Sequence, residues 1–237
     1  MKLSIIIPLY NEQSSILQVL DNLGNIVFPE FITTKEIIVV DDASKDNSVK
    51  SVQEYQKKDS SIILVQHTTN KGKGAAVKTG IAESTGDVIL IQDADLELSP
   101  DDIPEMLKAM HYLNVDFING SRYLPGVYRP LSSYRRYVGN KLFTFITSVL
   151  INVKLTDMAC GYKLFKRSLY NTISLKENRF GFEAELIIKA LRIKKNNIAE
   201  VPVKYFPRNE GEGKKLRNTD GFKILFTIFK YGFLRLK

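Results

Sequence analysis

Residues 88–95 read Val88-Ile89-Leu90-Ile91-Gln92-Asp93-Ala94-Asp95, an apolar run that ends in two carboxylates. The run is too short for a buried helix and is rich in branched side chains, so it is predicted to be a core strand. Runs of the same kind recur at Leu3 to Ile7, Ile37 to Val40, Ile62 to Val65 and Val115 to Ile118. The first half of the chain therefore contains a series of short buried strands.

Stretches with helical spacing separate these strands, and several follow an Asn, Asp or Ser that is suited to capping a helix. They cover Glu12 to Leu23, Asn47 to Gln56, Gly74 to Glu83 and Asp101 to Leu113. Strand and helix in alternation predict an α/β fold with a mostly parallel sheet and helices on both faces.

The second half of the chain departs from this alternation. Its predicted elements are a loop over Tyr123 to Arg136, a helix from Phe143 to Leu150, a strand from Gly161 to Phe165, a helix from Glu183 to Lys194 and a strand from Ile198 to Val203. From Gly221 onward, apolar side chains recur at helical spacing with basic residues between them: Phe222, Leu225, Phe226, Phe229, Phe233 and Leu236, with Lys223, Lys230, Arg235 and Lys237. This pattern predicts a basic, amphipathic C-terminal helix.

The composition is that of one globular domain, since 237 residues with 44% hydrophobic side chains can bury a sizeable core. The single Cys160 excludes an internal disulfide framework, and His67 and His111 are too few for a Cys/His zinc site. The first residues show no secretory signal, and the longest uncharged stretch, Leu142 to Val153, is too short to span a bilayer. We therefore expect a cytoplasmic protein without a membrane-spanning helix.

Charge is distributed unevenly between the two halves. Residues 1–121 carry 10 Lys and Arg against 18 Asp and Glu, and residues 122–237 carry 24 against 8. A basic half suits a phosphate-bearing ligand, an acidic lipid surface or nucleic acid, or it serves only solubility. There is no pattern typical of a nucleic-acid-binding motif, which makes a nucleic-acid-binding protein the remote alternative.

Acidic side chains gather where the predicted strands end, and ligands of such sheets bind at that edge. Asp41 and Asp42 follow one strand, and Asp93 and Asp95 follow another, with Glu97 close behind. Carboxylates so spaced can bind Mg²⁺ or Mn²⁺, or they can form local turns. Neither a dinucleotide fingerprint nor a P-loop is present.

Several motifs give the chain a specific resemblance. They are Ile6-Ile7-Pro8-Leu9-Tyr10-Asn11-Glu12, Val39-Val40-Asp41-Asp42, Asn70-Lys71-Gly72-Lys73-Gly74, Asp93-Ala94-Asp95-Leu96-Glu97, Gly120-Ser121-Arg122-Tyr123, Thr156-Asp157-Met158-Ala159-Cys160-Gly161-Tyr162-Lys163, and Phe180-Gly181-Phe182-Glu183-Ala184-Glu185. Their order resembles family 2 inverting glycosyltransferases, in particular the dolichol-phosphate mannose synthase branch of polyprenyl-phosphate glycosyltransferases. The chain departs from many relatives in having Glu97 in place of Gln and Gly139 in place of Ser.

The resemblance implies a GT-A type fold in a single domain, with a nucleotide-sugar-binding half (1–121) and a basic, acceptor- and membrane-facing half (122–237). It implies residues for donor binding, for metal coordination and for catalysis, with Asp93 and Asp95 each belonging to two of these sets. The donor set is Pro8, Tyr10, Glu12, Asp42, Lys73, Asp93 and Ala94, the Mg²⁺ or Mn²⁺ ligands are Asp93, Asp95 and Glu97, and the catalytic pair is Asp95 and Asp157.

Four basic residues are candidates to bind an acceptor phosphate, because guanidinium groups match phosphate oxygens and Lys supplies a point charge. They are Arg122, Arg135, Arg208 and Lys214. The leading hypothesis is transfer of a hexose from GDP-mannose or UDP-glucose to a polyprenyl phosphate, at the cytoplasmic face of a membrane that the basic helices contact. The alternative is transfer to a glycan hydroxyl, in which Asp157 would act as the base. The oligomeric state is not indicated by the sequence.

Overall fold

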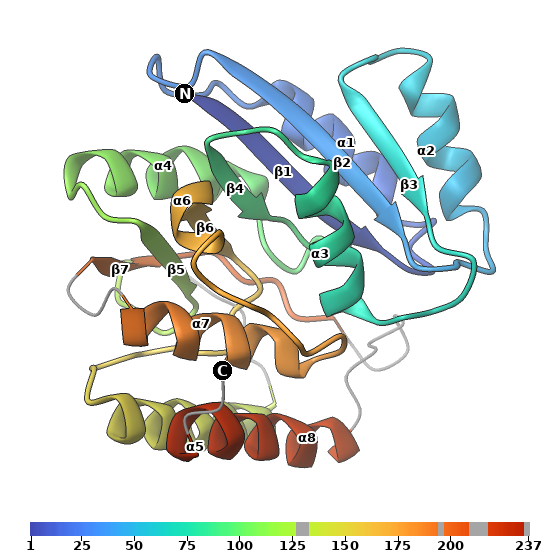
Figure 1. Cartoon of the computed structure of the whole chain (residues 1–237). Helices are drawn as coiled ribbons and strands as arrows, with labels where there is room; N and C mark the ends of the chain where they lie inside the picture. Colours follow the sequence, from blue (N-terminus) through green and yellow to red (C-terminus); the bar gives the residue numbers. More distant parts are fainter. Residues whose placement is uncertain (127–132, 194–196, 209–217, 235–237) are drawn as a thin grey trace.

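A computed structural model of the chain describes residues 1–126, 133–193, 197–208 and 218–234 (Figure 1). Within these residues, seven strands form one sheet in the order β3-β2-β1-β4-β6-β5-β7. The strands are β1 (Lys2–Leu9), β2 (Thr34–Asp41), β3 (Ile62–Gln66), β4 (Val88–Ile91), β5 (Phe117–Ser121), β6 (Lys163–Lys166) and β7 (Ile198–Pro202). Strand β6 is antiparallel to its neighbours β4 and β5, and the other pairs are parallel. The predicted mostly parallel sheet is confirmed.

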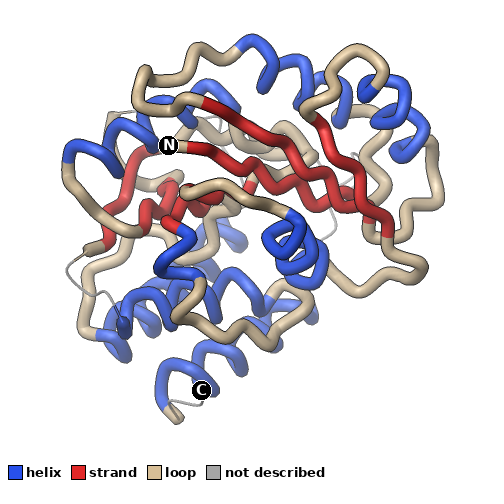
Figure 2. Tube along the Cα trace, turned by 45° about the horizontal axis from the view of Figure 1, so that its top comes forward, coloured by secondary structure: helices blue, strands red, loops and turns tan. Residues whose placement is uncertain are grey.

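Helices connect the strands and cover the sheet (Figure 2). They are α1 (Ile16–Asn25), α2 (Ser48–Gln56), α3 (Lys73–Glu83), α4 (Ile103–Tyr112), α5 (Tyr134–Ile151), α6 (Arg167–Tyr170), α7 (Gly181–Ile193) and α8 (Asn218–Ile228). A 3₁₀ turn (Pro100–Asp102) precedes α4, and a π-helical turn (Phe229–Phe233) continues α8. None of the described helices is long and apolar enough to cross a membrane.

Alternation of side chains along β1 builds a core on each face of the sheet. Leu3, Ile5 and Ile7 pack with α1 and α4 on one face, whereas Ile6 packs with α3 and α7 on the other. A third apolar cluster joins the outer side of α7 to α5, α8 and the π turn. Helices α5 and α8 therefore form an additional layer, which lies at the bottom of Figure 1.

Three local predictions were wrong. Strand β5 starts at Phe117, because the backbone N–H of Val115 instead bonds Met110 O at the end of α4. Helix α5 starts at Tyr134, inside the predicted loop. The sequence did not indicate this start, because the first turn of the helix is polar and lacks apolar side chains at helical spacing. The short helix α6 was not predicted. Residues 127–132 of the predicted loop lie outside the described residues.

Candidate active site

The carboxyl ends of β1, β2 and β4 lie together, as the parallel register requires: Leu9 pairs with Asp41, and Ile6 pairs with Ile91. The turn after each of these strands contains a residue in the left-handed region, with φ of 49° at Asn11, 62° at Ala43 and 58° at Leu96. For Ala and Leu this conformation is strained, and such strain clusters at functional sites. The edge that the sequence predicted to bind ligands is therefore also where the backbone is least relaxed.

Asp42 anchors the loop that enters α3. Its buried carboxylate accepts hydrogen bonds from the backbone N–H groups of Lys71 and Gly72, at 2.8 and 2.7 Å. The ring of His67 lies 2.8 Å from the same carboxylate. Gly72 has a φ of +99°, a conformation that L side chains rarely adopt. The predicted nucleoside-binding residue Asp42 thus has a structural task in this loop, whereas Asp41 caps the local turn at Ser44.

Lys73, the first residue of α3, lies between two carboxylates. Its Nζ is 2.6 Å from Asp93 Oδ1 and 2.6 Å from Glu183 Oε1 on α7. Burial would lower the pKa of Lys73, but the two carboxylates outweigh it and raise the pKa above its ordinary value. Lys73 is therefore a fixed cation within the predicted donor site.

Asp95 lies among like charges. Burial, Asp93 and Glu97 raise the pKa of the Asp95 carboxyl to about 7, against the opposing effects of the Glu97 N–H and Arg208. Glu97 itself accepts hydrogen bonds from Arg208 N at 3.0 Å and Tyr205 Oη at 3.3 Å. Carboxylates crowded in this way repel one another, and a cation at Asp95 would relieve that repulsion.

Arg208, which was predicted to bind the acceptor phosphate, bonds residues at the carboxylate edge of the sheet. Its Nη1 is 2.8 Å from Glu12 Oε2, its Nη2 donates to Ser15 Oγ at 3.1 Å, and its Nε donates to Asp95 O at 2.8 Å. These bonds tie the segment after β7 to the ends of β1 and β4. Arg208 thus places a positive charge beside Glu12 at this edge.

Arg122 and Asp157 form a buried ion pair at the end of β5. Arg122 Nε and Nη2 donate to the two carboxylate oxygens at 2.7 and 2.9 Å, and Arg122 N donates a third bond. Asn140 Nδ2 on α5 supplies a fourth, at 2.8 Å. Burial alone would raise the pKa of Asp157, yet Arg122 and Asn140 hold it below its usual range. A carboxylate with four donors and a lowered pKa is poorly suited to act as a general base.

Sequence reasoning assigned no role to three residues that complete this region, although Glu200 lies in the motif Ala199 to Val203. Glu200 on β7 accepts bonds from Thr156 N at 2.8 Å and Asn119 Nδ2 at 2.9 Å, which fixes the loop that carries Asp157. The second is Asn140, described above. The third, Tyr205, has Arg122 5.1 Å from its ring centroid and bonds Glu97 through its hydroxyl. Isolated Glu, Asn and Tyr residues carry no spacing signal, so only the fold could reveal them.

The other predicted residues are placed as follows. Pro8 and Tyr10 are half-buried at the end of β1, and Ala94 is buried, with its carbonyl accepting a bond from Ser15 Oγ at 2.7 Å. Arg135 is exposed in the first turn of α5. Lys214 lies outside the described residues.

The predicted metal ligands do not form a three-carboxylate cluster. Among the described residues, no group of three or more His, Cys, Asp or Glu side chains is arranged to hold a metal ion. The chemistry of the edge nevertheless fits Mg²⁺ or Mn²⁺, because such ions are bound by one or two carboxylates together with substrate phosphates. Asp95, with Asp93 and Glu97 close by, remains the predicted ligand at this edge.

A family model described as glycosyl transferase family 2 matches residues 4–174, which include the carboxylate edge, Arg122 and Asp157. The chain belongs to this family. The chain is similar to a UDP-N-acetylglucosamine–dolichyl-phosphate N-acetylglucosaminyltransferase of Methanococcus voltae, 30% identical over 94% of this chain and 93% of the relative. A dolichyl-phosphate beta-glucosyltransferase of Trichomonas vaginalis is 33% identical, over 94% of this chain and 68% of that protein.

A dolichol-phosphate mannosyltransferase of Pyrococcus furiosus is 29% identical, and the match covers 97% of this chain and 63% of the relative. The family resemblance seen in the motifs is thereby confirmed. Among solved structures, glucosyl-3-phosphoglycerate synthase of Mycobacterium tuberculosis, crystallised with Mn²⁺ and UDP, superposes with a TM-score of 0.74 at 17% identity. That match covers 98% of this chain and 80% of the synthase, and it confirms the GT-A-like fold of this family 2 glycosyltransferase.

Proposed function

We propose that this family 2 glycosyltransferase moves a hexose from a nucleotide diphosphate sugar to a polyprenyl phosphate at a membrane surface, with the help of Mg²⁺ or Mn²⁺. The observation that carries the proposal is the position of α5. Through Asn140 this helix bonds Asp157, the partner of Arg122, while its opposite side exposes a row of apolar side chains. The site for an anionic acceptor is thus built on the same helix as an apolar surface.

The acceptor side suits an anion that needs no deprotonation. Arg122 lies against Asp157 and the Tyr205 ring, and Lys141 on α5 lies 4.3 Å from the Tyr123 ring centroid. A phosphate acceptor is already ionised at neutral pH, so a strong base is not required. A sugar hydroxyl would need one, and Asp157, with its lowered pKa, does not suit that task. This difference favours a polyprenyl phosphate over a glycan hydroxyl.

The donor side supplies carboxylates and fixed cations for a diphosphate. A divalent cation bound there would offset the charge that develops on the leaving nucleotide. Asp95 would hold this cation, Glu12 and Asp42 lie at the strand ends where the nucleoside is expected, and Arg208 fixes both segments. The relatives named above act on dolichyl phosphates, which agrees with this assignment.

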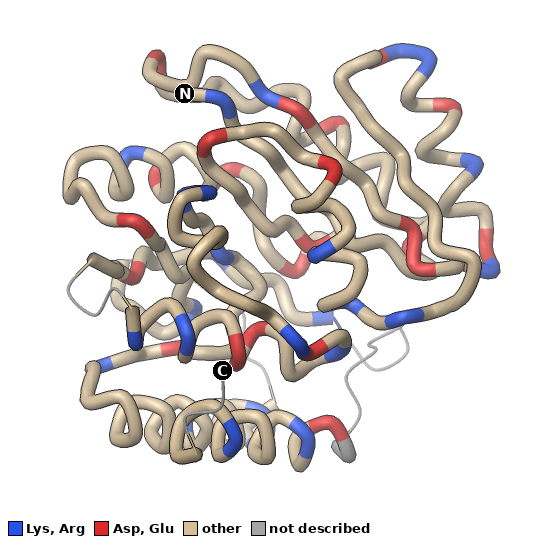
Figure 3. The backbone as a smooth tube through the Cα atoms, viewed as in Figure 1, with Lys and Arg blue, Asp and Glu red and all other residues tan. Residues whose placement is uncertain are grey.

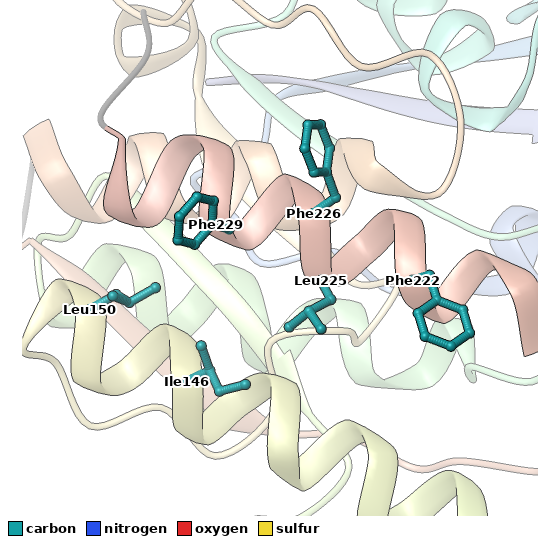
Figure 4. A pocket seen from close by; sticks show the side chains of 6 residues that line it. All are labelled: Ile146, Leu150, Phe222, Leu225, Phe226 and Phe229. Carbon is teal, nitrogen blue, oxygen red and sulfur yellow. The ribbon is translucent and has the colours of Figure 1, made fainter.

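The surface formed by α5 and α8 supports contact with lipid. Val138, Leu142, Phe145 and Val149 are exposed along α5, and Phe222, Phe226, Phe229 and Phe233 are exposed along α8 and its π turn. Between the helices lies a cavity of about 430 Å³ lined by Ile146, Leu150, Phe222, Leu225, Phe226 and Phe229 (Figure 4). A contiguous apolar area of this kind on a solvent-exposed face marks an interaction site. Figure 3 shows few charged positions along these two helices, mostly Lys and Arg, with an acidic position at the start of α8.

The predicted basic character of the tail is only partly available to a lipid surface. Lys230 Nζ is 2.9 Å from Glu177 Oε1, and Lys223 Nζ is 3.4 Å from Asp220 Oδ1. The apolar rows, more than these lysines, would therefore determine binding. Arg235 and Lys237 lie outside the described residues.

The test is transfer of label from GDP-mannose, UDP-glucose and UDP-N-acetylglucosamine, each supplied separately with polyprenyl phosphate and Mg²⁺ or Mn²⁺. We expect one donor to give an organic-extractable product whose formation stops when the metal is chelated. If product forms only with a glycan acceptor and stays in the aqueous phase, the enzyme transfers the sugar to a hydroxyl group instead. Activity that persists in the presence of a chelator would show that the reaction does not depend on a divalent metal.

A further inference from the structure

One oxygen of Asp93 is paired with a cation, and the other lies against a glycine. Asp93 Oδ1 is 2.6 Å from the ammonium of Lys73. Asp93 Oδ2 lies so close to Gly161 that a Cβ built on this glycine would be 2.1 Å from it. A divalent cation bonded to Asp93 Oδ1 at about 2.0–2.2 Å would lie next to an ammonium of the same charge. Oδ1 of Asp93 is therefore a poor metal-binding atom unless Lys73 moves away.

Glu183 holds Lys73 in place from the opposite side. Its Oε1 is 2.6 Å from Lys73 Nζ, and the two side chains are only 16% and 21% exposed. Glu183 lies in the first turn of α7, and the packing there leaves little room for α3 to shift. A Cβ on Gly74 would come within 2.6 Å of Phe182 Cβ, so the two helices touch at this point. The ammonium of Lys73 is thus fixed by a charge on α7 and by close packing of α3.

We propose that Glu183 is a positioning residue of the donor site, holding the ammonium of Lys73 on Asp93 so that Lys73, and not the divalent cation, neutralises Asp93. The divalent cation is then carried by Asp95 and the donor diphosphate. This inference rests on the proposed metal-dependent function. It specifies which carboxylate is neutralised by Lys73 and which one binds the divalent cation. It assigns a role to Glu183, which the motif alone does not give.

The test is Mn²⁺ binding, measured by titration in the presence of UDP or GDP and without acceptor. Asp93→Asn keeps the size of the side chain, and we expect it to change the Mn²⁺ affinity by less than about threefold, whereas Asp95→Asn abolishes binding. Lys73→Met leaves Asp93 available as a ligand and is expected to tighten Mn²⁺ binding roughly tenfold. Glu183→Gln should shift the affinity in the same direction by less, and Glu183→Asp should restore it.

Lys78→Met is the matched control. Lys78 lies on the same helix and bonds Asn178 Oδ1 at 2.6 Å, away from Asp93, so its loss should leave Mn²⁺ binding unchanged. If Asp93→Asn loses Mn²⁺ as completely as Asp95→Asn, or if Lys73→Met weakens binding, the inference is wrong while the metal-dependent function stands. If the unmodified protein binds no Mn²⁺ with either nucleotide, both are wrong.

Discussion

Arg122 donates two parallel hydrogen bonds, 2.7 and 2.9 Å long, to the fully buried carboxylate of Asp157. The bond pair orients the guanidinium and keeps Asp157 ionised. Asp157→Asn would leave Arg122 without its counter-charge, and breaking a buried pair in this way costs about 3–5 kcal/mol of stability. We expect a clear fall in the thermal unfolding midpoint together with loss of transfer.

A second change at this pair separates binding from proton transfer. Arg122→Lys keeps the charge but loses the planar fork, so the KM for the phosphate acceptor should rise roughly tenfold while the KM for the donor stays unchanged. The pH profile of kcat should show no Asp157 ionisation between pH 5 and 8, because the lowered pKa keeps the carboxylate charged throughout. If kcat instead falls at acidic pH within that range, and this fall is absent from Asp157→Asn, Asp157 acts as a general base.

Tyr205 contacts both Arg122 and Glu97, and these two contacts can be tested one at a time. Tyr205→Phe removes the 3.3 Å hydrogen bond to Glu97 and keeps the ring beside Arg122. Tyr205→Ala removes both. We expect a change in acceptor KM of about twofold for Phe and about tenfold for Ala, in line with a cation–π contact of about 1 kcal/mol. Equal effects of the two variants would mean that the ring contributes nothing.

Gly161 should tolerate no side chain, because a Cβ would lie 2.1 Å from Asp93 Oδ2. Gly161→Ala is expected to displace Asp93 and to reduce transfer at least tenfold. Gly139 in α5 is the control, since a Cβ there meets nothing within 4 Å. Gly139→Ala should keep activity and add about 0.5–1 kcal/mol to the free energy of unfolding, as expected in a helix. Circular dichroism and assays of both variants measure the contrast.

Glu36 gives a prediction for stability in acid. Although burial disfavours its charge, hydrogen bonds from Lys2, Thr85 and Ser4 lower its pKa from 4.5 to about 2. The resulting stabilisation, on the order of 2 kcal/mol, is present above pH 4.5 and disappears as the pH falls toward 2. Denaturant titrations should show Glu36→Gln to be less stable than the parent at pH 7 and equal to it near pH 2. A constant gap at every pH would contradict the assignment.

The apolar rows on α5 and α8 predict binding to vesicles. Phe145 and Phe226 are each 66% exposed, and each aromatic ring buried in lipid contributes about 2 kcal/mol. The double change to Ser should lower co-sedimentation with lipid vesicles at least tenfold and leave turnover of a short, water-soluble polyprenyl phosphate unchanged. Tyr112→Ser, an equally conspicuous exposed aromatic on α4, serves as the control and should have no effect.

The order of strands and helices in the first half followed from sequence because each strand is a compact apolar run followed by acids. Asp42, Asp93 and Asp95 therefore lay where the parallel register brings them. Pairing partners could not be predicted in the same way. That Arg208 bonds Glu12, 196 positions earlier in the chain, depends on the return path after β7, and no local pattern encodes it. The same holds for the contacts of Lys73 with Glu183 and of Tyr205 with Arg122.

Helix α5 is a single rod of 18 residues, about 27 Å long, with Asn140 near its second turn and its exposed row running past that point to Val149. An acceptor whose phosphate lies beside Arg122 would have only its first isoprene units next to this rod, and the remainder of the tail would lie among lipids. The protein would then recognise the phosphate and the first isoprene units of the acceptor, and the length of the remaining tail would not affect binding. One enzyme could serve a mixed population of carriers, and the tail length found in a cell would be determined by the enzyme that elongates it.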